Sequence, residues 1–116
     1  MSLTQRIAGR TVVFEVDGQL IVGNRHELKR RMLAALADGT RGFVIDFSRT
    51  EYIDSSGLGA LVSLSKEVRA EGGELRLASL DEDLRTLFEL TGLDTFFRIS
   101  DDAEEARRTI TTNTPS

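Results

Sequence analysis

The chain has 116 residues, of which 40% are hydrophobic and 29% charged, and this length and balance are typical of one globular domain. It has no cysteine and one histidine, which excludes a disulfide scaffold, a cysteine-ligated zinc site, thiol catalysis and any site that needs two imidazoles. The formal net charge of −4 lacks the basic surplus of most nucleic-acid binders, so we expect no direct contact with nucleic acid.

The apolar runs are only a few residues long, so no membrane insertion is expected. Residues 1–6 lack the apolar core of a secretion signal. These features predict a cytoplasmic protein, and nothing in the sequence demands more than a monomer.

The first 22 residues predict a hairpin after a loose N-terminal segment, residues 1–10. Thr11–Val16 is apolar and β-branched and reads as a strand, with Gln19–Val22 as the return strand. Asp17 and Gly18 predict the two-residue turn between them, because both residue types tolerate a positive φ.

A helix and a buried strand are predicted next. Asn24 and Glu27 have the spacing of a capping box, and Gly39 is expected to end the helix. The apolar face of this helix carries Leu28, Met32, Leu33 and Leu36. The run Phe43–Phe47 is apolar at nearly every position, which is typical of a central strand covered on both faces.

The second half of the chain alternates helices and strands. After a loop from Ser48 to Asp54, a helix is predicted over Ser55–Glu71, with the inner residues Leu58, Leu61, Val62 and Val68. A strand over Leu75–Ala78 follows, and then a helix that is opened by the capping box Ser79–Glu82 and ended by Gly92. The last predicted elements are a strand over Phe96–Ile99 and a helix that is capped by Asp101–Glu104 and runs to about Ile110.

This order of elements predicts an α/β fold. Because strand–helix–strand crossovers make strands parallel and a hairpin makes them antiparallel, we expect a small mixed β-sheet of four to five strands with about four helices. The domain is expected to span residues 1–110, followed by a flexible C-terminal tail over residues 111–116.

The most informative segment, Ile53–Ala60, follows a buried strand and opens a helix. Asp54 or Ser55 alone would suffice as an N-cap, so the further polar residue Ser56 is surplus to capping. Gly57 and Gly59 each cost a helix roughly 1 kcal/mol relative to alanine, which indicates a role other than helix stability. A phosphate on Ser55 would gain from the helix dipole and add roughly −1.5 to −2 charge beside Asp54.

The run from Ile53 to Gly59, preceded by Val44–Phe47, resembles the signature of the STAS domain, and in particular the bacterial anti-sigma factor antagonists. Gly73–Leu77 and Leu87–Leu93 also resemble that family, as does Gly18–Leu20. The resemblance covers about residues 9–110.

The resemblance implies a partner switch rather than an enzyme. In that family the unmodified antagonist binds an anti-sigma factor that is also a serine protein kinase, and this binding frees the sigma factor. The kinase phosphorylates the serine after the aspartate, here Ser55, which ends the binding, and a serine phosphatase reverses the modification. No cofactor and no metal are expected, and the predicted partner-binding residues are Asp54, Ser55, Ser56, Gly57, Leu58 and Gly59.

One departure from the family pattern is Ile21, at a position where many antagonists carry an aspartate. The alternative function is therefore a non-switching STAS subunit of a membrane transporter complex. A third possibility, a small hydrolase, lacks a base for Ser55, and Ser63–Lys66 matches one hydrolase motif without its companions.

Two further features leave alternatives open. The basic residues Arg25, Lys29, Arg30, Arg31 and Arg41 form either a surface for an acidic partner or a solvated face. Ala60 and Leu64 form a small apolar track that is either a partner surface or core. His26 is expected to be a surface residue, far in sequence from every candidate nucleophile.

Overall fold

The computed structural model describes residues 2–110. Its elements, in chain order, are β1 (Ser2–Ala8), β2 (Thr11–Leu20), α1 (Arg25–Ala37), β3 (Gly42–Asp46), β4 (Thr50–Ile53), α2 (Ser55–Ala70), β5 (Glu74–Ala78), α3 (Glu82–Leu90), β6 (Arg98–Ser100) and α4 (Ala103–Thr109). The sheet order is β1-β2-β3-β5-β6, and β4 pairs with the end of β2. The pairing of β1 with β2 is antiparallel and every other pairing is parallel. The predicted mixed α/β fold is confirmed, with six strands rather than four to five.

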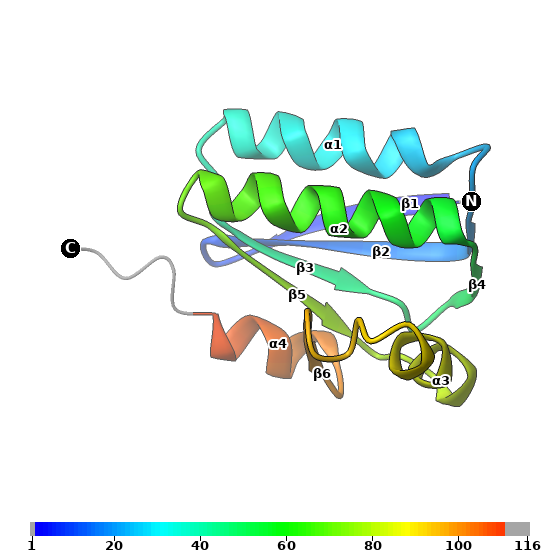
Figure 1. Ribbon diagram of the computed structural model, residues 1–116. Helices are drawn as coiled ribbons and strands as arrows, with labels where there is room; N and C mark the ends of the chain where they lie inside the picture. Colours follow the sequence, from blue (N-terminus) through cyan, green and yellow to red (C-terminus); the bar gives the residue numbers. More distant parts are fainter. Residues whose placement is uncertain (1, 111–116) are drawn as a thin grey trace.

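Helices lie on both faces of the sheet (Figure 1). Helices α1 and α2 lie side by side on one face, while α4 covers the other. The larger core fills the space under α1, α2 and α3 and includes Phe14, Leu28, Met32, Phe43, Ile45, Leu61, Leu64, Leu77 and Phe88. The smaller core lies against α4 and consists of Val13, Val44, Ala78, Ala103, Ala106 and Ile110.

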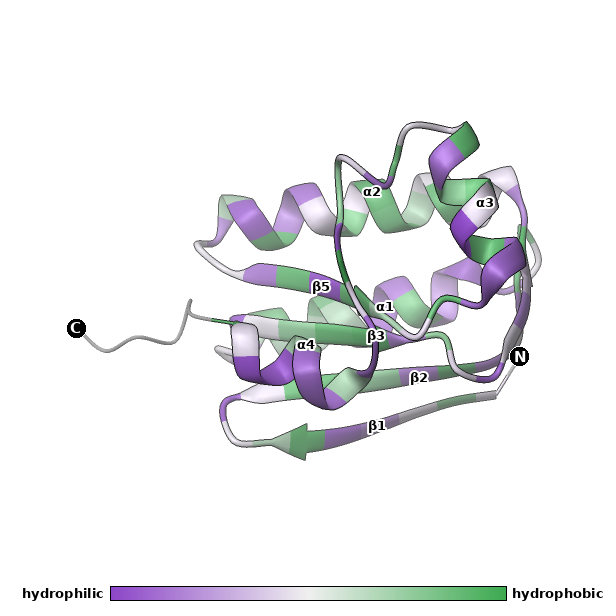
Figure 2. Cartoon of the chain, turned by 90° about the horizontal axis from the view of Figure 1, so that it is seen from below, coloured by the Kyte–Doolittle hydropathy of each residue, from purple (hydrophilic) through white to green (hydrophobic). Residues whose placement is uncertain are grey.

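The central strand is predicted correctly because both of its faces are buried. Phe43 and Ile45 enter the larger core and Val44 the smaller one. Figure 2 shows this strand, β3, as a mainly hydrophobic segment, whereas β1 at the edge of the sheet combines hydrophilic and hydrophobic segments.

The predicted hairpin is wrong. Residues 2–8, expected to be loose, form strand β1, and the turn of the hairpin lies at Gly9 and Arg10, where Gly9 has a φ of +66°. Strand β2 continues through Asp17 and Gly18. Gly18, with a φ of +104°, marks a register shift in the pairing of β2 with β4. Gly18 was expected to allow the positive φ of a turn, and it instead allows the positive φ of a β-bulge-like register shift inside a long strand.

Strand β4 lies within the segment that the sequence predicts as a loop. It is short, and its two middle residues are exposed, so it leaves no apolar pattern in the sequence. Tertiary bonds hold it: the buried Thr50 hydroxyl donates to the carbonyl of Val16 at 2.7 Å, and the Gly18 N–H donates to the carbonyl of Arg49 at 3.0 Å. These contacts place the following residues, Asp54 and Ser55, directly beyond the end of β2.

Helix positions agree with prediction better than helix caps do. Helix α2 begins at Ser55 as predicted, with Asp54 as its N-cap. The predicted capping box of α1 is wrong, because the Asn24 side chain accepts from the Ile21 N–H and donates to the Gln19 carbonyl instead of capping the helix.

The C-terminal elements are also shifted. The N-cap of α3 is Asp81 rather than Ser79, and its side chain accepts from the Leu84 N–H at 2.8 Å. Strand β6 starts at Arg98 rather than Phe96, because the N–H groups of Phe96 and Phe97 both donate to the Leu93 carbonyl in a turn, at 3.0 and 2.9 Å. The tail, residues 111–116, lies outside the described residues. In residues 2–110, no helix combines the length and apolarity needed to cross a bilayer.

Candidate functional site

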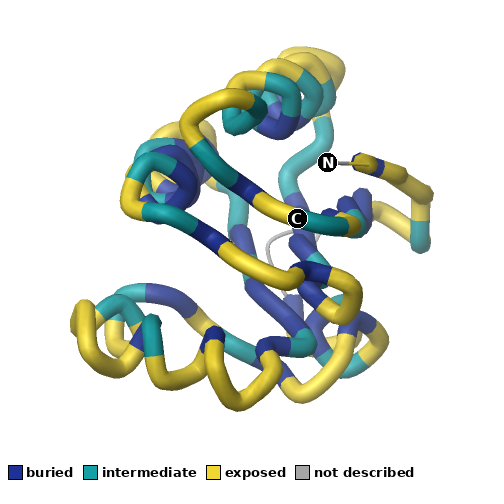
Figure 3. Tube along the Cα trace, turned by 90° about the vertical axis from the view of Figure 1, so that its right-hand side faces the viewer, coloured by how far each residue is buried: buried dark blue, intermediate teal, exposed yellow. Residues whose placement is uncertain are grey.

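The predicted site lies where helices α1 and α2 begin, beyond the carboxyl ends of the parallel strands (Figure 1). Figure 3 views the molecule from this end. Ser55 and Gly59 are exposed, Asp54 and Ser56 are partly buried, and Gly57 and Leu58 are buried. The structure therefore gathers four of the six predicted residues at the surface and puts the other two beneath them.

Asp54 connects two segments through both of its carboxylate oxygens. Oδ1 accepts from the Gly57 N–H at 2.8 Å and caps α2, while Oδ2 accepts from the Val22 N–H at 3.1 Å. The Asp54 N–H in turn donates to the Leu20 carbonyl at 3.1 Å. Asp54 thus fixes the start of α2 against the loop between β2 and α1.

The two glycines of the site differ in what surrounds them. A Cβ added to Gly57 would lie 2.5 Å from the Leu20 carbonyl oxygen and 2.9 Å from Cγ2 of Ile53. A Cβ on Gly59 would have nothing within 4 Å. Close packing of α2 on β2 therefore requires glycine at position 57, whereas the fold imposes no such requirement at position 59.

Ser55 is the first residue of α2 and is exposed. Its hydroxyl makes no hydrogen bond with any residue in the described range, 2–110. The first N–H groups of a helix lack intrahelical acceptors and carry partial positive charge, so an anion on this side chain is favoured electrostatically. Ser55 is therefore accessible to a modifying enzyme without disturbing an existing contact.

Leu58 and the Ala60–Leu64 track belong to the interior. Leu58 and Ala60 are 8% and 6% exposed, and Leu64 is fully buried. Of the two interpretations of this track, core is correct. The buried Leu58 supports the position of the site residues and offers little surface to a partner.

Two exposed hydrophobic residues beside the site were missed from the sequence. Val22 is 60% exposed and Tyr52 is 53% exposed. Val22 is joined to Asp54 by the bond described above, and Tyr52 lies two residues before Asp54, opposite Gln19 of β2. The exposure of these two side chains follows from the pairing of β4 with β2. The sequence instead predicts Val22 as part of a return strand and Tyr52 as part of a loop.

The side chains near the site are not arranged for serine catalysis. Both Asp54 oxygens accept backbone N–H groups, and no base bonds to Ser55 within the part of the chain that the structure describes. His26 is exposed as predicted and lines the same hollow as Ser56, with no hydrogen bond between them. The Ser63 hydroxyl contacts Lys29 at 3.4 Å rather than Lys66. Residues 2–110 contain no cluster of three or more potential metal ligands.

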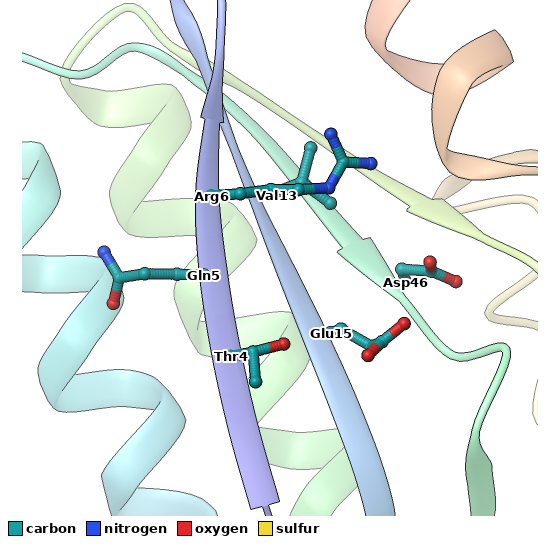
Figure 4. A pocket seen from close by; sticks show the side chains of 6 residues that line it. All are labelled: Thr4, Gln5, Arg6, Val13, Glu15 and Asp46. Carbon is teal, nitrogen blue, oxygen red and sulfur yellow. The ribbon is translucent and has the colours of Figure 1, made fainter.

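A separate hollow of about 220 Å³ lies on the α4 side of the sheet, on strands β1, β2 and β3. Figure 4 shows Arg6, Glu15 and Asp46 projecting to one side of the sheet there. This hollow combines one cation with two carboxylates, and none of its lining residues belongs to the predicted site.

Comparisons with known proteins agree on the family. The STAS domain family model matches residues 2–106. The anti-sigma-B factor antagonist of Staphylococcus aureus is 30% identical over 90 residues, covering 78% of this chain and 83% of that protein. The crystal structure of TM1081, a candidate anti-sigma factor antagonist from Thermotoga maritima, superimposes with a TM-score of 0.87 at 28% identity, covering 93% of each chain.

A third similar structure is that of the Bacillus cell fate determinant SpoIIAA in its phosphorylated form, with a TM-score of 0.74 at 24% identity, covering 92% of this chain and 97% of that one. At this level of identity the likeness shows the fold. From the match of the family model over nearly all described residues, together with the relative from Staphylococcus, the chain belongs to the STAS domain family.

Proposed function

We propose that this protein is an anti-sigma factor antagonist whose binding is switched by phosphorylation of Ser55. The observation that carries the proposal is the exposed, unbonded Ser55 hydroxyl at the first position of α2, directly after the capping Asp54. The named function of the Staphylococcus relative supports the antagonist role.

In the unphosphorylated state, the surface around Asp54, Ser55, Ser56 and Gly59 binds an anti-sigma factor that is also a serine kinase, and the sigma factor is released. Gly57 and Leu58 hold this surface from below. The exposed side chain of Val22, whose N–H donates to Asp54, adds apolar contact area to this surface.

The kinase transfers the γ-phosphoryl group of ATP to Oγ of Ser55. The Oγ–P bond forms, the bond between the γ-phosphorus and ADP breaks, and the hydroxyl proton leaves to a base of the kinase or to solvent. The product carries roughly −1.5 to −2 additional charge at the start of α2, which weakens the complex by repelling acidic groups of the partner. A serine phosphatase restores the hydroxyl by hydrolysis and releases inorganic phosphate.

Peptide mass spectrometry of the protein purified from its native host tests the modification. We expect phosphate on the peptide that contains Ser55 in the wild type and its loss in Ser55→Ala, with Ser56→Ala as the matched control that keeps the phosphate. Absence of phosphate under several growth conditions would contradict the switch and favour a constitutive STAS subunit, the function to which Ile21 points.

Binding tests the consequence of the modification. Ser55→Ala should retain its partner, whereas Ser55→Asp should bind more weakly, with a difference on the order of a few kcal/mol. Titration calorimetry against the kinase partner recovered with Ser55→Ala measures this difference. Equal affinities of the two variants would refute charge repulsion as the mechanism.

A further inference from the structure

A groove beside Ser55, between the first halves of α1 and α2, is lined by basic residues on one side and small residues on the other. We call it the basic groove. Its volume is about 350 Å³, and its lining residues are Arg25, His26 and Lys29 from α1 and Ser56, Gly59, Ala60 and Ser63 from α2.

The α2 side of the basic groove is shaped for close approach to the helix backbone. Ser56 and Ala60 are four residues apart, as are Gly59 and Ser63, so the four residues lie on one face of α2. Gly59 has open space where a Cβ would stand, although glycine costs a helix about 1 kcal/mol relative to alanine. The fold does not require that glycine, and its effect is to keep the groove open.

On the α1 side, positive charge is available near Ser56. Arg25 and His26 form no side-chain hydrogen bond or ion pair within residues 2–110. Lys29, at the far end of the groove, donates to the Ser63 hydroxyl at 3.4 Å and forms an ion pair with the half-exposed Glu67 at 3.9 Å.

The other basic and acidic groups nearby are already engaged. Arg30 and Arg31 both bond to Glu27, each at 2.8 Å, and the Asp54 carboxylate accepts two backbone N–H groups. The end of the basic groove nearest Ser55 is therefore positive, on a chain whose formal net charge is −4.

We propose that the basic groove receives an acidic segment of the anti-sigma factor, whose carboxylates face Arg25 and compete with Glu67 for Lys29 while its backbone packs against Gly59. This inference rests on the proposed function, because its occupant is the same partner. Opposite charges across an interface accelerate association and fix its register, and an amphipathic segment lying in a groove is a common mode of recognition.

An acidic occupant also explains why a phosphate would end the binding. Ser55 precedes Ser56 of the groove and stands one helical turn before Gly59. A phosphate there repels carboxylates of the segment and competes with them for the cations of α1. A basic segment in the same place would bind more tightly after phosphorylation, opposite to the proposed switch.

A photocrosslinker inserted in the native host tests the occupant. The substitution His26→p-benzoylphenylalanine places the probe at the exposed α1 rim of the groove and leaves the open space at Gly59 unfilled. We expect a cross-link to a segment of the partner with an excess of Asp and Glu, identified by peptide mass spectrometry. Failure to cross-link in a strain where Ser55→Ala retains its partner, or a cross-link to a segment without acidic excess, would overturn the proposal.

Charge variants in the same assay separate this inference from the switch. Arg25→Glu with Lys29→Gln removes the positive charge without setting a new carboxylate beside Glu67, and should lower the yield of cross-link by about tenfold or more. The matched control, Arg108→Glu with Arg98→Gln, makes the same change in net charge at exposed positions on α4 and β6, and should keep the yield. Circular dichroism melting of both variants verifies that they fold.

The two sets of variants together show whether the phosphorylation switch or the groove proposal has failed. If Ser55→Asp abolishes the cross-link and the charge variant behaves like its control, the switch stands and the basic groove is not the docking site for an acidic segment. If the charge variant abolishes the cross-link and Ser55→Asp does not, the groove proposal stands and the phosphorylation switch fails.

Discussion

Alanine substitutions at Gly57 and Gly59 should change stability in opposite directions, although the two residues lie in the same turn of α2. Each change removes the helix penalty of glycine, worth about 1 kcal/mol. At position 59 nothing within 4 Å opposes the new methyl group. Gly59→Ala should therefore raise the free energy of unfolding by about 1 kcal/mol and the melting temperature by about 4 °C.

At position 57 the methyl group would stand 2.5 Å from the Leu20 carbonyl oxygen, a backbone atom that cannot rotate away. Relief requires α2 to move from the end of β2, with an overpacking cost of about 1–3 kcal/mol. The same movement lengthens the bond from the Asp54 N–H to the Leu20 carbonyl, worth about 1 kcal/mol. Gly57→Ala should accordingly lower the free energy of unfolding by about 2 kcal/mol.

Urea denaturation of the wild type and the two variants, followed by circular dichroism, measures both effects. The Gly59→Ala variant is the matched control, since it makes the same chemical change in the same helix. Equal changes of either sign in the two variants would refute the argument from close packing and leave helix propensity as the whole explanation.

Three other changes test the structure around the site. Asp54→Ala removes both the cap and the bond to Val22 and should lower the free energy of unfolding by about 1–2 kcal/mol in urea denaturation, with a smaller loss in Asp54→Asn; an unchanged midpoint for Asp54→Ala would contradict this role. Leu64→Ala should lower the free energy of unfolding by about 2–5 kcal/mol in the same assay. A loss no larger than that expected of a surface residue would contradict the burial of Leu64 and favour its interpretation as part of a partner surface. Hydrogen bonds from Arg30 and, second, from Arg31 lower the pKa of Glu27. The contribution of Glu27 to stability is therefore present above its unfolded-state pKa and is lost as the pH falls through the lowered folded-state pKa. In Arg30→Gln, an NMR titration should show the pKa of Glu27 return toward its ordinary value, and an unchanged pKa would refute the pairing.

The sequence predicts those elements whose burial leaves a local pattern. Strand β3 is apolar on both faces, and α2 carries its apolar spacing in sixteen consecutive residues that directly follow its cap, Asp54. Strand β1 has no such pattern, because six of its seven side chains escape full burial; Leu3 enters the larger core and Ala8 packs only partly buried against the smaller one. It forms because β2 offers it an antiparallel partner.

Local turn composition predicts the wrong backbone conformation where a long-range strand pairing determines it. Asp17 and Gly18 have the composition of a hairpin turn, yet β2 continues through them to reach β4. The position of His26 shows the same limit for the site. It is thirty residues from Ser56 in sequence and lines the same groove, because two successive crossovers place α1 beside α2.

Two adjacent residues at the start of α2 differ in how much they contribute to the fold. Asp54 uses both carboxylate oxygens to hold α2 against the loop after β2, so changes there act on stability. Ser55 contributes no side-chain hydrogen bond within residues 2–110, and a phosphate on it meets the favourable end of the helix dipole. Under the proposed switch, phosphorylation of Ser55 would therefore leave the contacts of the fold intact and change the charge that a partner meets beside the basic groove. A switch built in this way acts through the binding equilibrium, because its on and off forms share one folded structure.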